Sequence, residues 1–147
     1  MIVKAADKDI DPIIDVWEAS VRKTHDFLHE DYMLEIKSLL PSIFPSVDLY
    51  ISKNETGKIA GFLGVANRKI EMLFVHPDFM GKGIGRALAK FAIEKLNMYK
   101  VDVNEQNQQA VDFYKHIGFV TLGRSDVDGL GKPYPLLHME YRRERQG

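Results

Sequence analysis

Residues 73–88, LFVHPDFMGKGIGRAL, run from an apolar segment through a glycine-rich turn into an apolar helix pattern. Three glycines fall within five positions of that turn: Gly81, Gly83 and Gly85. Glycines let the backbone approach a ligand closely, and the first N–H groups of the following helix lie at the positive end of its dipole without partners inside the helix. The turn therefore suits a phosphate or pyrophosphate group. The alternative is a tight strand-to-helix turn that binds nothing.

Two common nucleotide-binding motifs do not fit this turn. A dinucleotide fingerprint, Gly-x-Gly-x-x-Gly, starting at Gly81 or Gly83 would end at Arg86 or Leu88, and no GxxxxGK[ST] motif occurs in the chain. Neither a dinucleotide nor a nucleoside triphosphate site is indicated.

Outward from the turn, the chain alternates strand-like and helix-like patterns. Strands are predicted at residues 2–4, 47–52, 59–66, 69–75, 99–103, 119–125 and 135–141. Helices are predicted after Asp11 as N-cap with Pro12 as first helical residue, at Tyr32–Leu40 with Pro41 as its breaker, from Gly85 to Asn97, and from Ala110 to Ile117 with Gly118 following. This order predicts a mixed α+β fold.

Composition limits the class of protein. A chain of 147 residues with 45% hydrophobic content predicts one domain spanning residues 1–147. A formal net charge of −1 gives no reason to expect a nucleic-acid partner, and Arg142, Arg143 and Arg145 are interpreted as a solvated tail. The absence of cysteine excludes disulfides and thiolate metal sites. With no apolar run of about 20 residues, we expect no membrane association and a cytoplasmic location.

Two motifs in this chain resemble signatures of the GNAT superfamily of N-acetyltransferases. The acetyl-CoA signature, Gln/Arg-x-x-Gly-x-Gly/Ala after a strand ending apolar-x-Val-x-Pro, is matched by Leu73, Val75, Pro77, Gly83, Gly85 and Leu88. The signature Asn-x-x-Ala-x-x-Phe-Tyr-x-x-x-Gly-Phe is matched by Asn107, Ala110, Phe113, Tyr114, Gly118 and Phe119. The stretches SVRKTHDFLHEDY and GRSDVDGLGKPYPLL resemble a bacterial subgroup of this family. Met80 departs from the pattern, since the family has Gln or Arg there.

The resemblance implies a fold and a cofactor. The fold is a mixed, mostly antiparallel sheet of about seven strands, flanked by about four helices, whose two central parallel strands splay apart around acetyl-CoA. The backbone of Leu73, Phe74 and Val75 would pair with the pantetheine arm as an added strand does. The pyrophosphate would lie on the turn formed by Gly81, Lys82, Gly83, Ile84, Gly85 and Arg86. Lys82 and Arg86 are equally well explained as solvated side chains.

The resemblance also suggests the catalytic groups. Tyr114 matches the family tyrosine that faces the cofactor sulfur and acts as general acid; its alternative role is an amphipathic core residue. Asn107 would cap or orient its helix and contact the cofactor, and capping alone is a sufficient explanation for it. Glu71 and His25 are rival candidates for the general base, and an exposed strand carboxylate explains Glu71 equally well. Strand alternation places Glu71 on one face with Lys69 and Leu73.

In the family, the segment that joins the first two helices contributes residues to the acceptor site. We therefore expect the acceptor pocket there. His25, Asp26 and Phe27 would line it, and Tyr134 would close the other side. A surface turn and a structural loop aromatic are the competing interpretations. His25 and His29 have the spacing of a helical metal pair, but no third ligand accompanies them, so no metal is expected.

These observations predict an acetyl-CoA-dependent N-acetyltransferase that transfers the acetyl group to a primary amine by direct attack in a ternary complex. The acceptor would be a small-molecule or peptide amine, and the protein would be a monomer or homodimer. The alternative is a non-catalytic CoA or acyl-CoA sensor, which Met80 favours and Tyr114 argues against.

Overall fold

A computed structural model describes residues 1–142, which form seven strands and four α-helices in two compact units. The first unit spans Met1–Met98 and the second begins at Tyr99. The mixed α+β class is confirmed, with every assigned strand pair within each unit antiparallel. The single-domain arrangement and the splayed parallel strands stay predictions. Arg143 and Arg145 lie outside the described residues.

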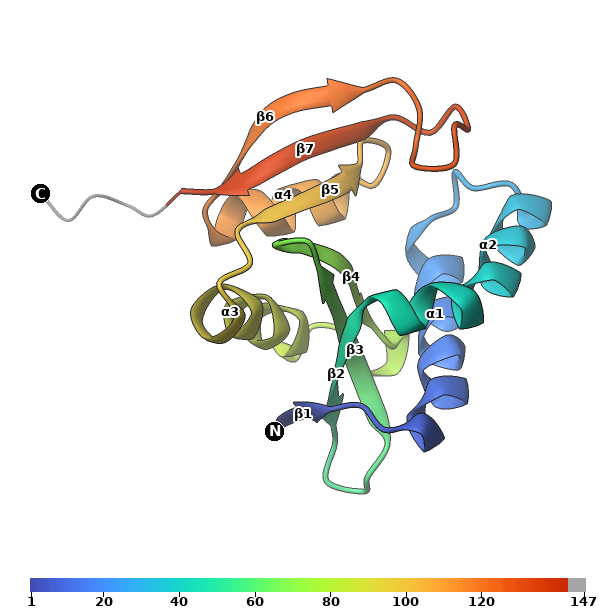
Figure 1. The fold of residues 1–147 in the computed structure, drawn as a ribbon, viewed down its shortest axis with the longest axis vertical. Coiled ribbons are helices and arrows are strands. Elements are labelled where there is room, and N and C mark those ends of the chain that lie inside the picture. The colour runs from blue at the N-terminus through green and yellow to red at the C-terminus, as the bar shows by residue number, and fades with distance from the viewer. Residues whose placement is uncertain (143–147) are drawn as a thin grey trace, which may run out of the picture. The chain divides into compact units, whose positions relative to one another are not determined.

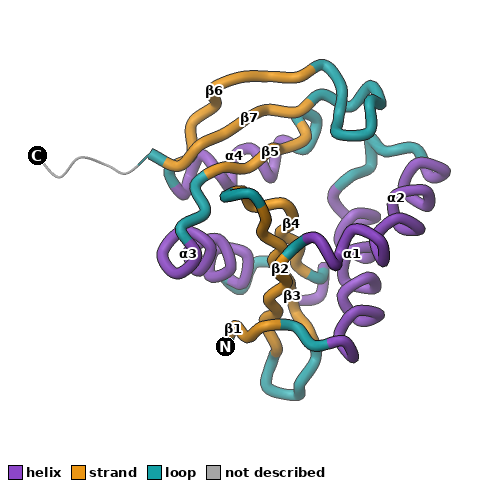
Figure 2. The backbone as a smooth tube through the Cα atoms, viewed as in Figure 1, coloured by secondary structure: helices purple, strands orange, loops and turns teal. Residues whose placement is uncertain are grey.

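The first unit is a four-stranded antiparallel sheet between helices (Figure 1). Its strands are β1 (Ile2–Lys4), β2 (Asp48–Lys53), β3 (Ile59–Ala66) and β4 (Lys69–Val75). Its helices are α1 (Ile10–Thr24), α2 (Glu30–Ile43) and α3 (Ile84–Leu96). Helix α1, with α2 beside it, covers one face of β3 and β4, and α3 covers the other (Figure 2).

The main apolar core of this unit lies beneath α1 and α2. Helix α1 contributes Ile13, Trp17 and Val21 at helical spacing, and Phe62 on β3 is fully buried against them. Phe74 on β4 stacks on Phe62 at 5.6 Å between ring centroids. This packing anchors the C-terminal end of α1 and the C-terminal end of β4 on the same face of the sheet.

Two helix boundaries differ from the sequence prediction. Helix α1 begins at Ile10, so Asp11 and Pro12 lie inside its first turn, where the missing proline N–H costs no helix hydrogen bond. Helix α2 continues through Pro41 to Ile43. That proline removes one hydrogen bond close to the helix end, where buried Leu40 and Phe44 hold the last turn against the core.

The second unit is a three-stranded antiparallel sheet with one helix. Strand β7 (Leu136–Tyr141) lies between β5 (Lys100–Asn104) and β6 (Phe119–Ser125). Helix α4 (Gln108–Ile117) packs on β5 and β6, where Val111 and Tyr114 are buried. As predicted, α4 is capped by Asn107 and followed by Gly118, which has φ +127°.

Candidate active site

The glycine turn connects β4 to α3 with two residues in the left-handed region. Gly81 has φ +79° and Gly83 has φ +81°, and Gly83 is the N-cap of α3. A Cβ atom added at either position would find no heavy atom within 4 Å, so the space beside both glycines is open. This backbone is strained for any residue with a side chain, whereas glycine adopts it readily.

The N-terminus of α3 presents backbone donors. Its first helical hydrogen bond runs from the N–H of Ala87 to the carbonyl of Gly83 at 3.0 Å, so the N–H groups of Ile84, Gly85 and Arg86 precede the helical ladder. The N-cap makes no side-chain hydrogen bond. Together with the positive end of a 13-residue helix dipole, these donors suit an anionic group.

Two positively charged side chains lie at the edge of this turn. The side chains of Lys82 and Arg86 are exposed, and the Lys82 ammonium lies 5.6 Å from the centre of the Phe79 ring. Met80, where the family has Gln or Arg, has an extended backbone and is half-buried. The turn therefore offers backbone donors inside and side-chain charge at its rim.

Strand β4 has backbone groups that β3 does not use. The His76 N–H donates to the Ala60 carbonyl at 2.8 Å, and ladder bonds in an antiparallel pair alternate along the strand. By that alternation Phe74 exchanges hydrogen bonds with Phe62, whereas the backbone groups of Leu73 and Val75 point away from β3. Leu73 and Val75 can thus pair with an extended ligand, while Phe74 contributes its ring to the core.

Glu71 lies at a β-bulge, which overturns the predicted alternation. The β3–β4 register pairs Gly64 with Met72 and Val65 with Ile70, so Glu71 has no residue opposite it. Gly64 and Val65 are neighbours on β3 and face opposite sides of the sheet. Their partners Met72 and Ile70 therefore face opposite sides too, although they are two residues apart. Lys69 and Leu73 consequently lie on opposite faces, and the prediction that Glu71 shares a face with both is wrong. The Glu71 side chain is exposed.

Tyr114 lies on α4, and Asn107 is the N-cap residue of that helix. The Tyr114 side chain is only 6% exposed, and its ring meets Phe113 and Phe119 edge-on at 5.0 and 5.2 Å between centroids. Burial raises the pKa of the Tyr114 phenol, so the hydroxyl keeps its proton at neutral pH. The Asn107 side-chain oxygen accepts from the Ala110 N–H at 3.2 Å, which confirms the predicted cap.

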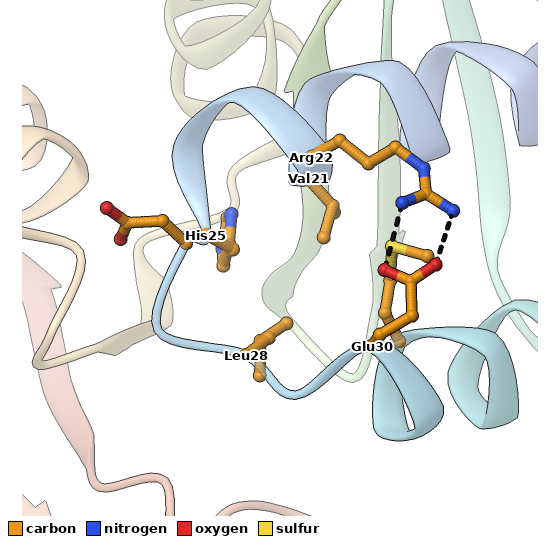
Figure 3. A pocket seen from close by; sticks show the side chains of 7 residues that line it. Val21, Arg22, His25, Leu28 and Glu30 are labelled. Carbon is orange, nitrogen blue, oxygen red and sulfur yellow. Dashed lines mark hydrogen bonds and ion pairs between the residues drawn. The ribbon is translucent and has the colours of Figure 1, made fainter.

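A pocket of about 200 Å³ lies between the end of α1 and the start of α2 (Figure 3). Its lining consists of Val21, Arg22, His25, Asp26, Leu28, Glu30 and Met33. Two parallel hydrogen bonds of 2.9 Å join the Arg22 guanidinium to the Glu30 carboxylate across its rim (Figure 3). Two predicted acceptor-site residues therefore line one pocket, His25 and Asp26. Phe27 lies beside it, 5.3 Å from the His25 ring.

Ion pairs extend from this rim along both helices. Arg22 also contacts Glu18 on its own helix, and Glu18 contacts Lys37 of α2. Hydrogen bonds from Lys37 and then Arg22 lower the pKa of Glu18. The chain Lys37–Glu18–Arg22–Glu30 thus alternates in sign and joins α1 to α2 beside the pocket.

His25 ends α1 as a neutral, largely buried imidazole. The Thr24 hydroxyl donates to the Ser20 carbonyl at 2.8 Å and lies 2.7 Å from His25 Nδ1. Since that hydroxyl has one proton, Nδ1 must carry its own, which leaves Nε2 as the basic nitrogen. Burial lowers the pKa of His25 to about 4, against a smaller opposing effect of Asp26. His25 is therefore a weak proton acceptor at neutral pH.

This pKa predicts an acid-dependent loss of stability. The unfolded chain binds a proton at His25 below about pH 6.5, whereas the folded protein does so only near pH 4. The free energy of unfolding should therefore fall by roughly 3 kcal/mol as pH drops through this window, and should lose nothing further from His25 below it. Urea unfolding at several pH values measures this pH dependence of the unfolding free energy.

His25→Gln should flatten the plot of unfolding free energy against pH, whereas His116→Gln, at an exposed position, should not. Identical curves for wild type and His25→Gln would contradict the assignment.

The remaining candidates have structural contacts. His29 is the N-cap of α2, where its Nδ1 accepts from the Asp31 N–H at 3.2 Å. Tyr134 is half-buried in the β6–β7 connection, where its backbone N–H donates to the Lys132 carbonyl at 2.7 Å.

Within residues 1–142, no three His, Cys, Asp or Glu side chains are grouped to hold a metal ion. None of the described helices is long and apolar enough to span a membrane.

Comparison with known proteins decides the family. Residues 37–141 match the family model described as an acetyltransferase (GNAT) domain. The chain belongs to the GNAT acetyltransferase family. It is 43% identical over 129 residues to the peptidyl-lysine N-acetyltransferase YjaB of Escherichia coli (strain K12), a match that covers 88% of each chain. The enzyme class of this GNAT protein is therefore N-acetyltransferase.

Solved structures agree with the GNAT fold. The solution structure of apo YjaB from Escherichia coli superposes with a TM-score of 0.88 at 40% identity, covering 96% of both chains. A GCN5-related N-acetyltransferase from Rhodopseudomonas palustris has a TM-score of 0.78 at 21% identity, covering 96% of this chain and 94% of that one. The second likeness concerns the fold alone.

Sequence reasoning missed part of this GNAT protein's pocket. Five lining residues were not predicted as such: Val21, Arg22, Leu28, Glu30 and Met33. A signal was present, because Arg22 and Glu30 carry opposite charges at the two ends of the predicted inter-helix segment. Their bidentate geometry follows from the helix crossing, which the sequence does not specify.

Proposed function

We propose that this GNAT protein transfers an acetyl group from acetyl-CoA to the side-chain amine of a lysine in a peptide or protein. The observation that carries the cofactor assignment is the turn at Gly81–Gly83, where open space meets the donors of α3. The pyrophosphate accepts hydrogen bonds from Ile84, Gly85 and Arg86, and the rim charges of Lys82 and Arg86 add attraction. The extended pantetheine arm pairs with the outward backbone groups of Leu73 and Val75.

In this proposal the chemistry is direct attack within a ternary complex. The neutral lysine amine attacks the thioester carbonyl carbon, the carbon–sulfur bond breaks, and the departing sulfur receives a proton from the Tyr114 hydroxyl. Burial raises the pKa of that phenol, so the hydroxyl is protonated at neutral pH and is a weaker acid than a solvent-exposed phenol. The amine loses a proton to a base, for which Glu71 and His25 remain the candidates.

The acceptor class rests on the relatives and on the pocket. YjaB, which shares 43% identity with this chain, is a peptidyl-lysine N-acetyltransferase. The lining of the pocket between α1 and α2 includes the apolar residues Val21, Leu28 and Met33 and the carboxylate of Asp26. A lysine side chain has the matching character, an apolar stem that ends in a cation.

Calorimetric titration with acetyl-CoA, with ATP and NAD as controls, tests the cofactor assignment. We expect saturable binding of acetyl-CoA alone, because ATP and NAD carry a pyrophosphate but lack the pantetheine arm that pairs with Leu73 and Val75. Thiol release on addition of a lysine peptide then reports turnover, and the chain contributes no background since it has no cysteine. The matched peptide with arginine in place of lysine should be inert. Binding of ATP as tight as acetyl-CoA, or equal turnover of both peptides, would refute the proposal.

A further inference from the structure

Three polar side chains from neighbouring strands of the second unit form a hydrogen-bonded relay. Asp102 Oδ1 lies 2.7 Å from His138 Nδ1, and His138 Nε2 lies 2.6 Å from Ser125 Oγ. The acetyl-transfer proposal uses none of these residues.

Strand register explains why residues so distant in sequence meet here. Asp102 on β5 is directly opposite His138 on β7, and His138 is opposite Gly123 on β6. Ser125 is two residues beyond Gly123 and is therefore a diagonal neighbour of His138, within reach of a long side chain. Because Gly123 has no side chain, β6 leaves the imidazole uncovered at the directly opposite position.

The direction of the hydrogen bonds follows from the groups themselves. An ionised carboxylate only accepts, so the proton between Asp102 and His138 belongs to Nδ1. Nε2 of the neutral imidazole then accepts, and the Ser125 hydroxyl donates to it. The serine proton is directed at a base whose tautomer the carboxylate fixes, which is the arrangement that activates a serine nucleophile.

The relay is accessible. Val101 and Val103 are buried on the face of β5 that meets α4, so Asp102 between them lies on the opposite face. The side chains of His138 and Asp102 are 40% and 26% exposed, and Ser125 is half-buried. A small molecule can reach the hydroxyl without unfolding the sheet.

We propose that Ser125 is an activated nucleophile that accepts an acyl group from small activated esters, a second activity independent of amine acetylation. Ser125 Oγ attacks the ester carbonyl carbon while its proton passes to His138 Nε2. The ester carbon–oxygen bond breaks, and the leaving alcohol takes that proton. Water then attacks the acyl-serine through the same imidazole, releasing the acid and restoring the hydroxyl. Ser125 and His138 are the catalytic residues, and Asp102 is a positioning residue.

Acylation with p-nitrophenyl acetate tests the proposal, with an acid quench and digestion after glutamate. The fragment 106–140 holds Ser125 as its single serine. Fragment 36–55 is an internal control with four serines, Ser38, Ser42, Ser46 and Ser52. The first three are exposed and donate to backbone carbonyls instead of a base. We expect the acetyl group on Ser125 to form at least about 10²-fold faster than on those serines. Equal acetylation of the serines in both fragments, or acetylation of 106–140 as fast in Ser125→Ala as in the wild type, would overturn the proposal.

Variants of the other two positions separate activation from simple exposure. His138→Gln should slow Ser125 acylation by about 10²-fold or more, whereas His116→Gln should leave it unchanged. Asp102→Asn should also slow Ser125 acylation. The amide N–H can donate to Nδ1, which favours the tautomer that carries its proton on Nε2, and Nε2 can then no longer accept the serine proton. Imidazole nitrogen chemical shifts should report that tautomer change in the folded variant. If Asp102→Asn changed the tautomer but not the rate of Ser125 acylation, Asp102 would have no part in the mechanism. If His138→Gln left that rate unchanged, the proposed activation of Ser125 would be refuted. Tyr114→Phe should acylate normally, so this result does not depend on acetyl transfer to amines.

Discussion

Replacing Tyr114 by phenylalanine is expected to lower kcat for acetyl transfer by about 10²-fold or more, with the acetyl-CoA dissociation constant within about twofold of wild type. The substitution removes only the hydroxyl that would protonate the departing sulfur. The aromatic contacts of the ring with Phe113 and Phe119 remain, so folding should be retained. Single-turnover kinetics together with calorimetric titration of acetyl-CoA measure the two quantities separately.

Tyr141→Phe is the matched control for loss of a phenol in the same unit. Tyr141 packs on Phe119 at 5.6 Å and on Tyr99 at 6.4 Å between centroids, and has no part in the proposed chemistry. Its kcat should stay near that of wild type. If Tyr114→Phe turned over as fast as Tyr141→Phe, another group must protonate the sulfur. If both variants and the wild type bound acetyl-CoA without any turnover, a CoA sensor would describe the protein better.

Gly83→Ala is expected to weaken acetyl-CoA binding by about 10- to 100-fold. A methyl group at φ +81° fills the open space beside the donors and favours another backbone angle, so hydrogen bonds to a charged phosphate lengthen or break. Such bonds are worth about 1.5 to 3 kcal/mol each, which sets the expected range. Calorimetric titration measures the dissociation constant.

Gly57→Ala separates ligand loss from general backbone strain. Gly57 has φ +85° and equally open surroundings in the turn between β2 and β3. Both variants should lose similar unfolding free energy, on the order of 1 to 2 kcal/mol. Only Gly83→Ala should lose affinity. Equal affinities in the two variants would mean that the turn at Gly83 does not hold the pyrophosphate.

The sequence predicted the elements of the fold more reliably than their ends. Apolar segments bounded by turn residues located each strand, because burial in a sheet selects apolar residues and the turns between strands select glycine, proline and asparagine. Pro41 misled the prediction for α2, since tertiary packing of Leu40 and Phe44 outweighs the loss of one hydrogen bond. The bulge at Glu71 was beyond reach, because an extra residue in one strand is visible only against its partner.

Some parts of the candidate site could be predicted from the sequence and others could not. The glycine turn and the Asn107 cap follow from residues close together in sequence, so local rules were sufficient. The relay of Asp102, Ser125 and His138 depends on register between three strands, and their separation in sequence gave no local pattern. In retrospect, Asp102 between two valines and His138 between apolar residues mark polar positions on apolar strands.

The ion-pair chain of α1 and α2 also limits how this protein can diverge. Lys37, Glu18, Arg22 and Glu30 alternate in sign, so losing one end residue leaves a neighbour less neutralised, and losing Glu18 or Arg22 does so on both sides. Substitutions at these positions should be inherited in compensating pairs. Among descendants of a common ancestor, a charge reversal at Arg22 should therefore be accompanied by a reversal at Glu30, and their correlated history would record the contact between the two helices.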